Sequence, residues 1–416
     1  MPRRRIRLTA PAEVLSSTFR DIRAEIGIPE SFRPEVLAEA ESSTRSHRLP
    51  DVDRTEIPLV TLDPPESMDL DQAFHLERRR GGGFRLHYAI ADPSAFVTPG
   101  GAIDREAHRR AETAYSPDAR TPLYPPAISE SAASLLPDGP RPAVLWRVDV
   151  DADGLLVDAH VERALVSSRA KLGYADAQAA IDRGSADTML GLLPEIGSTL
   201  QEEERARGGA SLGLPTQEVV PGAGGFGLTF ASPLPVETWN AQLSLLTGRV
   251  SARIMLDGRV GVIRTMPPPD PHDVERLRRV ATGLGVDWPE VMTYPELLHT
   301  IDASRSTAHS VFLQEAAVLF RAAAYTAFDG EPPPDDEHAA IAAPYAHCTA
   351  PLRRLVDRYV NEVCLALVSG SDVPPWARGA LPALPIEMAL GGEKTGRLER
   401  TIVDAVEAAV LAPLVG

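Results

Sequence analysis

Three aspartates lie within nine residues of one another early in the chain. Asp63, Asp69 and Asp71 share this segment with Glu66 and two prolines, which fix φ and remove backbone donors, so a helix is not expected here. Asp69 and Asp71 are two positions apart and would point the same way in an extended segment. Crowded carboxylates repel each other unless a hard cation lies among them, and Mg²⁺ or Mn²⁺ takes such oxygen ligands. A solvated acidic loop that caps a helix is the alternative.

The composition is that of a soluble globular protein with a strongly negative charge. The 416 residues can bury a large core and hold two or three domains, and 44% are hydrophobic. The net charge of −16 argues against non-specific coating of nucleic acid, although a local basic channel is compatible with it. The sequence has no apolar run long enough to span a membrane, so we expect a cytoplasmic location by default. Cys348 and Cys364 form no disulfide framework or zinc-ligand spacing.

Hydrophobic periodicity predicts strands in the first half of the chain and helices in the second. We expect strands over residues 57–62, 72–77 and 84–91, a helix over 103–112 and a hairpin around Gly154. The proline-rich residues 116–140 predict little regular structure. Later helices are expected over residues 174–183, 237–256, 272–284, 294–303, 308–327, 352–368 and 394–411.

Five sequence blocks follow one another in an order and spacing that carry a family resemblance. They are residues 63–71, 90–97, 110–118 with 123–129, 168–174 and 345–357. Together they resemble the ribonuclease II/R family, the RNB-domain exoribonucleases, over about residues 52–370. The resemblance implies an α+β fold, in which a mixed or antiparallel sheet forms the core of a catalytic domain surrounded by helices.

The resemblance also suggests how the chain is divided and where it departs from the family. We expect a helical N-terminal extension (1–49), an RNB-like catalytic domain (50–370), and a linker with a C-terminal helix (371–416). The flanking segments are too short for the OB-fold RNA-binding domains that the family usually carries. Gln72 stands where the family has a further aspartate, and Leu214 where it has a stacking phenylalanine.

The resemblance assigns catalytic and metal-binding roles to residues of the first and last blocks. Asp63, Asp69 and Asp71 would be carboxylate ligands of Mg²⁺ or Mn²⁺, with Asp71 essential for catalysis, and Gln72 would act through a water. Arg353 would steady the scissile phosphate, because a planar, permanently charged guanidinium suits that role. Salt bridges to Asp357 or Glu362 on the same helix are the alternative for Arg353 and for its neighbour Arg354.

Four further residues are implied to contact RNA. Tyr115 would pack on the terminal nucleotide and Tyr174 on another base, since stacking tolerates any sequence. Arg354 would bind a neighbouring phosphate. Gln242, with Asn240 near it, occupies the place of an acidic helix that contacts the terminal sugar, and an amide there could recognise a 2′-hydroxyl. Half-buried structural tyrosines and an ordinary helix surface are the alternatives.

The resulting hypothesis is a divalent-metal-dependent 3′-to-5′ exoribonuclease that hydrolyses single-stranded RNA to nucleoside 5′-monophosphates. An RNA-binding protein that keeps the fold but has an incomplete second metal site is the alternative, favoured by Gln72 and the acidic composition. A phosphodiesterase acting on a small nucleotide is a third possibility. The three aspartates together with Arg353 favour the exoribonuclease over the binding protein.

Overall fold

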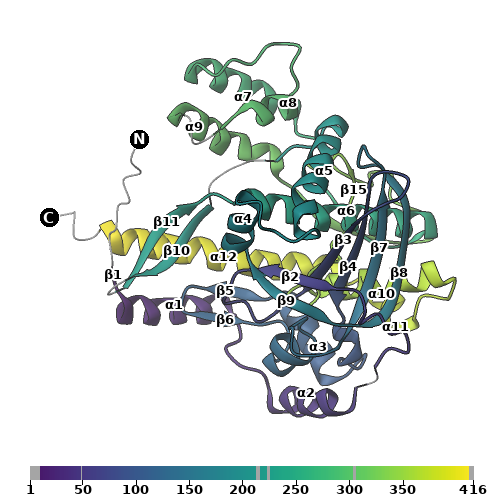
Figure 1. Ribbon diagram of the computed structural model, residues 1–416. Coiled ribbons are helices and arrows are strands. Elements are labelled where there is room, and N and C mark those ends of the chain that lie inside the picture. The colour runs from purple at the N-terminus through teal and green to yellow at the C-terminus, as the bar shows by residue number, and fades with distance from the viewer. Residues whose placement is uncertain (1–9, 48, 212–215, 223–224, 303–305, 412–416) are drawn as a thin grey trace.

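A six-stranded sheet forms the centre of the computed structural model, which describes residues 10–47, 49–211, 216–222, 225–302 and 306–411 (Figure 1). Its strand order is β8-β7-β4-β3-β2-β9. Neighbouring strands are antiparallel except for β2 and β9, which run parallel, so the sheet is mixed and the predicted α+β fold is confirmed. The strands are β2 (Leu59–Asp63), β3 (Gln72–Arg78), β4 (Phe84–Ala91), β7 (Arg141–Val150), β8 (Leu156–Val166) and β9 (Ser168–Gly173).

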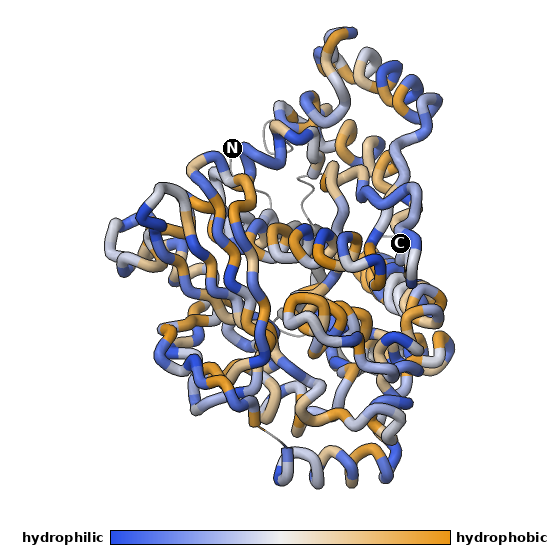
Figure 2. The backbone as a smooth tube through the Cα atoms, turned by 90° about the vertical axis from the view of Figure 1, so that its right-hand side faces the viewer, coloured by the Kyte–Doolittle hydropathy of each residue, from blue (hydrophilic) through white to orange (hydrophobic). Residues whose placement is uncertain are grey.

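Hydrophobic and hydrophilic residues both lie along the strands of the sheet (Figure 2), and the first half of β4 alternates between them. In β4 the side chains of Leu86 and Tyr88 are buried, whereas His87 between them is partly exposed. The sheet packs against α10 (Leu355–Ser369), which in turn packs against α6 (Pro235–Gly258). Trp146 of β7 donates from Nε1 to Asn361 Oδ1 of α10 at 3.2 Å, so the buried indole nitrogen is satisfied at this interface.

The first half of the chain contains the expected elements, together with others that were not predicted, such as β9. The three predicted strands are present, and the predicted hairpin joins β7 to β8 through Gly154, whose φ of +81° is a conformation that glycine adopts without strain. The predicted helix is α3 (Ala102–Arg110). A small hairpin pairs β5 (Ala114–Ser116) with β6 (Ala119–Thr121), and its second strand lies within the passage expected to be irregular.

The second half is mostly helical, and one predicted helix is partly a strand instead. A helix was expected over residues 308–327, but α9 ends at Ala316 and β13 (Ala324–Asp329) pairs with β12 (Val260–Thr265). That pairing joins residues more than fifty positions apart, so local periodicity does not reveal it. The other elements are α4 (Tyr174–Asp182), α5 (Leu193–Arg207), α7 (Pro271–Leu284), α8 (Tyr294–Thr300), α9 (Thr307–Ala316), β14 (Glu337–His338) and β15 (Ala343–Pro344).

The two ends of the chain pack against each other. Helix α1 (Ala12–Ile26) lies beside the long α12 (Leu384–Leu411), where Phe19 contributes to a shared apolar cluster with Leu398 and Ile402 (Figure 1). A three-stranded sheet of β1 (Ala10–Pro11), β11 (Gly225–Ala231) and β10 (Thr216–Gly222) joins them, and α2 (Pro34–Ser46) packs near α3.

The segment expected to be a linker is part of the main core instead. It contains α11 (Pro375–Ala380), and Ala377, Leu381 and Leu384 are buried, so apolar side chains outweigh its prolines. Helix α12 begins ten residues before the predicted start at 394. None of the helices in the described part of the chain combines the length and apolar character needed to cross a membrane.

Candidate active site

The aspartate segment joins the end of β2 to the start of β3 and is tied down by other parts of the chain. The buried Leu70 donates its N–H to Ser134 Oγ at 2.9 Å. Lys171 on β9 donates to the carbonyl oxygens of Pro65 and Ser67 at 2.6 and 2.5 Å. These contacts fix the backbone of a loop whose carboxylates would otherwise push it apart.

Asp71 meets the segment that precedes α10. Its Oδ1 accepts the Leu352 N–H at 2.7 Å, and its Oδ2 lies 3.6 Å from Arg353 Nε. The Arg353 carbonyl in turn accepts the Thr113 N–H at 2.9 Å. This bond holds the segment beside the strip that leads into β5, residues 112 and 113. Asp71 is buried, whereas about half of the Arg353 side chain is exposed. The fold therefore brings the early carboxylate and the late guanidinium together.

The electrostatics of this region leave negative charge incompletely compensated. Burial raises the pKa of Asp63 to about 6, against the lowering effect of Arg353. Burial likewise raises the pKa of Asp71 to about 8, with Asp69 adding to the rise. Because burial disfavours the charged carboxylate, an additional cation near both groups would stabilise their ionised forms.

Asp69 points to a different partner. Its carboxylate accepts a hydrogen bond from Arg120 of β6, whose other guanidinium nitrogen lies 2.5 Å from Glu130. In the described part of the chain, no group of three or more His, Cys, Asp or Glu side chains is arranged to hold a metal ion. Asp63 and Asp71 still offer carboxylate oxygens, which are suitable ligands for Mg²⁺ or Mn²⁺. Asp69 would have to leave Arg120 to join them.

Gln72 differs from its expected role. The first residue of β3 accepts a hydrogen bond at Oε1 from the hydroxyl of Tyr88, which is fully buried in β4. The amide oxygen expected to act on a metal through a water is therefore engaged inside the sheet.

Tyr115 on β5 lies at a cavity of about 550 Å³ together with Arg353. The other walls come from the strip before β5 and from α12, and half of the tyrosine is exposed. Partial desolvation, with the negative charge of Asp69, raises the pKa of Tyr115 to about 12, so its hydroxyl stays protonated at neutral pH. A neutral phenol ring at a cavity beside a guanidinium is arranged to pack against a base whose phosphate the guanidinium holds.

Tyr174 and the two amides of α6 do not share one environment. Tyr174, the first residue of α4, lies near Asp63 and within hydrogen-bonding reach of Asn240, and burial raises its pKa to about 12. Gln242 is buried and donates from Nε2 to Glu204 of α5 at 2.7 Å. Gln242 therefore serves a contact between helices, whereas Asn240 lies beside Tyr174, near Asp63.

Arg354 adopts the salt bridge that the sequence left open as its alternative. Its Nε and Nη2 lie 2.5 and 2.8 Å from the two carboxylate oxygens of Asp357, which is fully buried in the first turn of α10. Asp357 also accepts the Ala350 N–H at 2.7 Å. A phosphate contact by Arg354 would have to compete with this bidentate pair.

Several residues that shape the site were not identified from the sequence. Arg120 and Lys171 compensate and anchor the aspartate loop, and Thr395 of α12 lines the cavity beside Tyr115. Lys171 lies within a block that carries the resemblance, so the need to balance an acidic loop was an available signal. Nothing in the sequence pattern links α12 to the site. Leu214 lies outside the residues that the structure describes.

Comparisons with known proteins identify relatives that are longer than this chain. The protein is 26% identical to Ribonuclease R of Escherichia coli (strain K12) over 356 residues, which cover 79% of this chain and 42% of that relative. It is 37% identical to Exoribonuclease 2 of Proteus mirabilis (strain HI4320) over 146 residues, or 35% of this chain and 22% of the relative. The chain thus spans less than half the length of these curated relatives.

Solved structures share the fold at low sequence identity. The apo form of Mycoplasma genitalium RNase R superposes with a TM-score of 0.86 at 19% identity, covering 97% of this chain and 65% of that one. Yeast Ssd1, described as a pseudonuclease, gives a TM-score of 0.72 at 16% identity, covering 93% of this chain and 50% of its own. The family model described as the RNB domain matches residues 52–370, most of the chain. The chain therefore belongs to the RNB domain family.

Proposed function

We propose that this protein is a divalent-metal-dependent exoribonuclease that hydrolyses single-stranded RNA from its 3′ end to nucleoside 5′-monophosphates. The observation that carries the proposal is the meeting of Asp71 with Arg353, which shares a cavity with Tyr115. These groups offer a carboxylate for a cation, a guanidinium for a phosphate and a ring for a base. Mycoplasma genitalium RNase R, which has the same fold, has been solved in complex with ribose-methylated single-stranded RNA, which supports the choice of substrate.

Each residue has a separate task in the proposed reaction. Asp63 and Asp71 would hold Mg²⁺ or Mn²⁺, joined by Asp69 when its carboxylate leaves Arg120. A divalent ion bound there lowers the pKa of water and offsets charge on the phosphate oxygens. Arg353 would donate to the oxygens of the scissile phosphate, and Tyr115 would stack on the terminal base without selecting its identity.

End-labelled RNA tests this proposal. With Mg²⁺ or Mn²⁺, a 5′-labelled single strand should shorten stepwise, whereas a 3′-labelled strand should release labelled mononucleotide from the first turnover. The Asp71→Asn variant should show neither change. Internal fragments, or stepwise loss from the 5′ end, would exclude a 3′-to-5′ exonuclease.

A second candidate is an RNA-binding protein that does not hydrolyse its ligand. The contact of Arg120 with Asp69 and that of Tyr88 with Gln72 favour it, because both engage oxygens that a metal would need. Wild-type protein that retains labelled RNA without shortening it would support this candidate. A Gln72→Asp variant that then gained metal-dependent cleavage would show that the wild type lacks a carboxylate ligand at position 72.

A further inference from the structure

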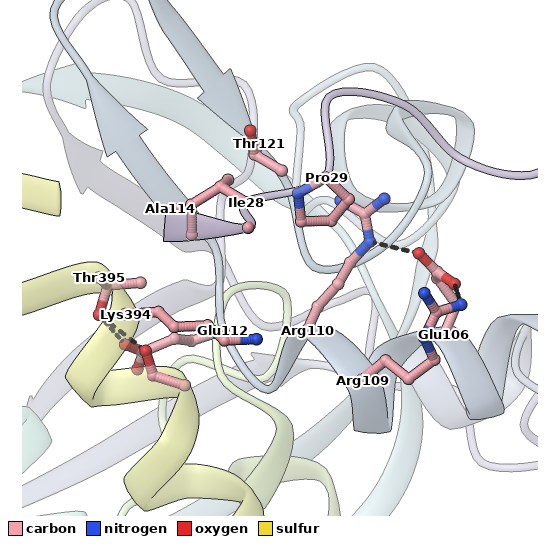
Figure 3. A pocket seen from close by; sticks show the side chains of 12 residues that line it. Ile28, Pro29, Glu106, Arg109, Arg110, Glu112, Ala114, Thr121, Lys394 and Thr395 are labelled. Carbon is pink, nitrogen blue, oxygen red and sulfur yellow. Dashed lines mark hydrogen bonds and ion pairs between the residues drawn. The ribbon is translucent and has the colours of Figure 1, made fainter. Parts of the chain in front are cut away.

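A second cavity of about 280 Å³ lies between α3 and α12 and shares Glu112 and Thr395 with the cavity at Tyr115 (Figure 3). We call it the α3–α12 cavity. Its other walls are the connection from α1 to α2 (residues 27–29), the end of α3, and residues of β5 and β6. Gly391 lets α12 approach closely, since a Cβ there would lie 2.6 Å from that of Ala111.

One wall of this cavity carries more positive than negative charge. The Glu106 carboxylate, whose side chain is 3% exposed, lies 3.0 Å from Arg110 Nε, 3.1 Å from Arg109 Nη1 and 3.3 Å from Arg33 Nη2. Arg33 also lies 3.2 Å from Glu35. Two carboxylates, Glu106 and Glu35, face these three guanidinium ions, so one positive charge remains in excess and the wall favours an anion.

The opposite wall supplies another cation. Lys394 extends from α12 into the cavity, toward the side on which Arg110 lies (Figure 3). Among the residues that the structure describes, Lys394 has no carboxylate at ion-pair distance. Arg109 is more than half exposed, so its guanidinium is accessible to a ligand. In a protein with a net charge of −16, cations facing each other across a cavity are a local exception.

The wall between the two cavities adds a hydrogen-bond acceptor. The Glu112 carboxylate accepts from Thr395 Oγ1 and lines both cavities. A ligand with a phosphate at one end and hydroxyl donors at the other would match the cations and this carboxylate at once. The volume lies near the lower end of the range for small-molecule pockets, which suits a ligand of one phosphate, one sugar and one base better than a longer chain.

We propose that the α3–α12 cavity binds a nucleoside 5′-monophosphate, with its phosphate at Arg109 and Lys394 and its ribose hydroxyls at Glu112. This inference rests on the proposed function, because the mononucleotide is the product of that reaction. The two cavities share the wall formed by Glu112 and Thr395, so a released mononucleotide would have a binding site directly beside the place where it forms.

Titration calorimetry on the full chain without divalent metal tests the inference, with AMP, adenosine and inorganic phosphate as separate probes. AMP should bind more tightly than either fragment. The Arg109→Ala and Lys394→Ala variants should each weaken AMP binding about tenfold, since each removes a charge-assisted hydrogen bond. Their matched controls are Arg105→Ala on α3 and Arg400→Ala on α12, exposed arginines that line neither cavity. Both controls should bind AMP as the wild type does.

Other results would overturn the inference. Adenosine or phosphate binding as tightly as AMP would remove the mononucleotide assignment, and so would AMP affinity unchanged in both variants. A short RNA whose binding falls in these variants, while AMP does not bind, would assign the cavity to the RNA chain instead.

A parallel assay separates this inference from the proposed function. Single-turnover cleavage of labelled RNA should be the same in wild type, Arg109→Ala and Lys394→Ala. Normal cleavage without AMP binding would refute the cavity assignment alone. AMP binding that both variants weaken, in a protein that never shortens RNA, would refute the proposed function and leave the site in place.

Discussion

Two arginines near the start of α10 have opposite surroundings. Arg358 is buried and each of its guanidinium nitrogens has a partner: Nη1 lies 2.5 Å from Asp104, Nε donates to Ser94 Oγ at 3.1 Å, and Nη2 donates to the Val97 carbonyl at 3.2 Å. Arg353, just before the helix, is half exposed, and within the described part of the chain its one carboxylate contact is to Asp71 at 3.6 Å.

This contrast separates residues that stabilise the fold from residues that belong to the candidate active site. A buried charge that is fully hydrogen-bonded holds elements together, and removing it leaves its partners unsatisfied. Arg353 and Asp71 are only loosely matched to each other, so both retain capacity for a phosphate and a cation. We therefore expect mutations at Arg358 to act on stability and mutations at Arg353 to act on catalysis.

The largest effect should be on the stability of the fold, when the buried Arg358 is removed. Arg358→Ala should reduce the free energy of unfolding by about 3–5 kcal/mol, because it leaves the buried Asp104 carboxylate without its guanidinium partner. Urea denaturation followed by circular dichroism measures this change. Arg400→Ala, an exposed arginine on α12, is the control and should stay within about 0.5 kcal/mol of wild type. Equal stability of the two variants would remove the distinction.

The next effect should be confined to the site. Arg353→Ala should slow single-turnover cleavage by about 10²–10³-fold, as expected when a donor to a charged transition state is lost. Its denaturation midpoint should match the wild type, because the side chain is half exposed and has one long contact. A large loss of stability in this variant would show that Arg353 stabilises the fold.

A smaller effect is expected for the aromatic residue at the cavity. Tyr115→Ala should weaken RNA binding by about 1–3 kcal/mol, the contribution of one stacked base. Tyr115→Phe should retain affinity, because stacking uses the ring and not the hydroxyl. Fluorescence anisotropy with labelled RNA and the cleavage-deficient Asp71→Asn background distinguishes the two. A loss in Tyr115→Phe equal to that in Tyr115→Ala would assign the hydroxyl, and not the ring, to the interaction.

The smallest effect concerns the partner of Asp69. Arg120→Gln should lower the Mg²⁺ concentration for half-maximal cleavage by up to about fivefold, since a partly exposed ion pair contributes about 1 kcal/mol or less. The carboxylate would no longer have to leave a guanidinium to reach the ion. An increased Mg²⁺ requirement would show that Arg120 supports metal binding by orienting Asp69.

The sheet was predictable because its signals are local. The strand over 84–91 alternates polar and apolar residues, and Gly154 marks the hairpin that follows. Residues 324–327 were predicted from local periodicity to end a helix, and only the pairing of β13 with β12 makes them part of a strand. The region after residue 370 was taken as a linker from its prolines, although Ala377 and Leu381 are buried in the core.

The site was predictable only where a motif carried it. The aspartates and Arg353 were found through sequence blocks, and the structure brings Asp71 and Arg353 together. The partners of their neighbours were not foreseeable: Gln242 bonds Glu204, and Gln72 bonds Tyr88. Which side of a helix or sheet an amide faces depends on tertiary packing, and sequence order alone does not determine it.

The most direct test of the central claim is a double-mutant cycle on the rate of single-turnover RNA cleavage. It compares wild type, Asp71→Asn, Arg353→Ala and the double variant. If both residues act on the same scissile phosphate, the double variant should be about as slow as the slower single variant, because groups that act as a unit are strongly non-additive. Rate losses that multiply would mean that Asp71 and Arg353 act independently, and would contradict this account.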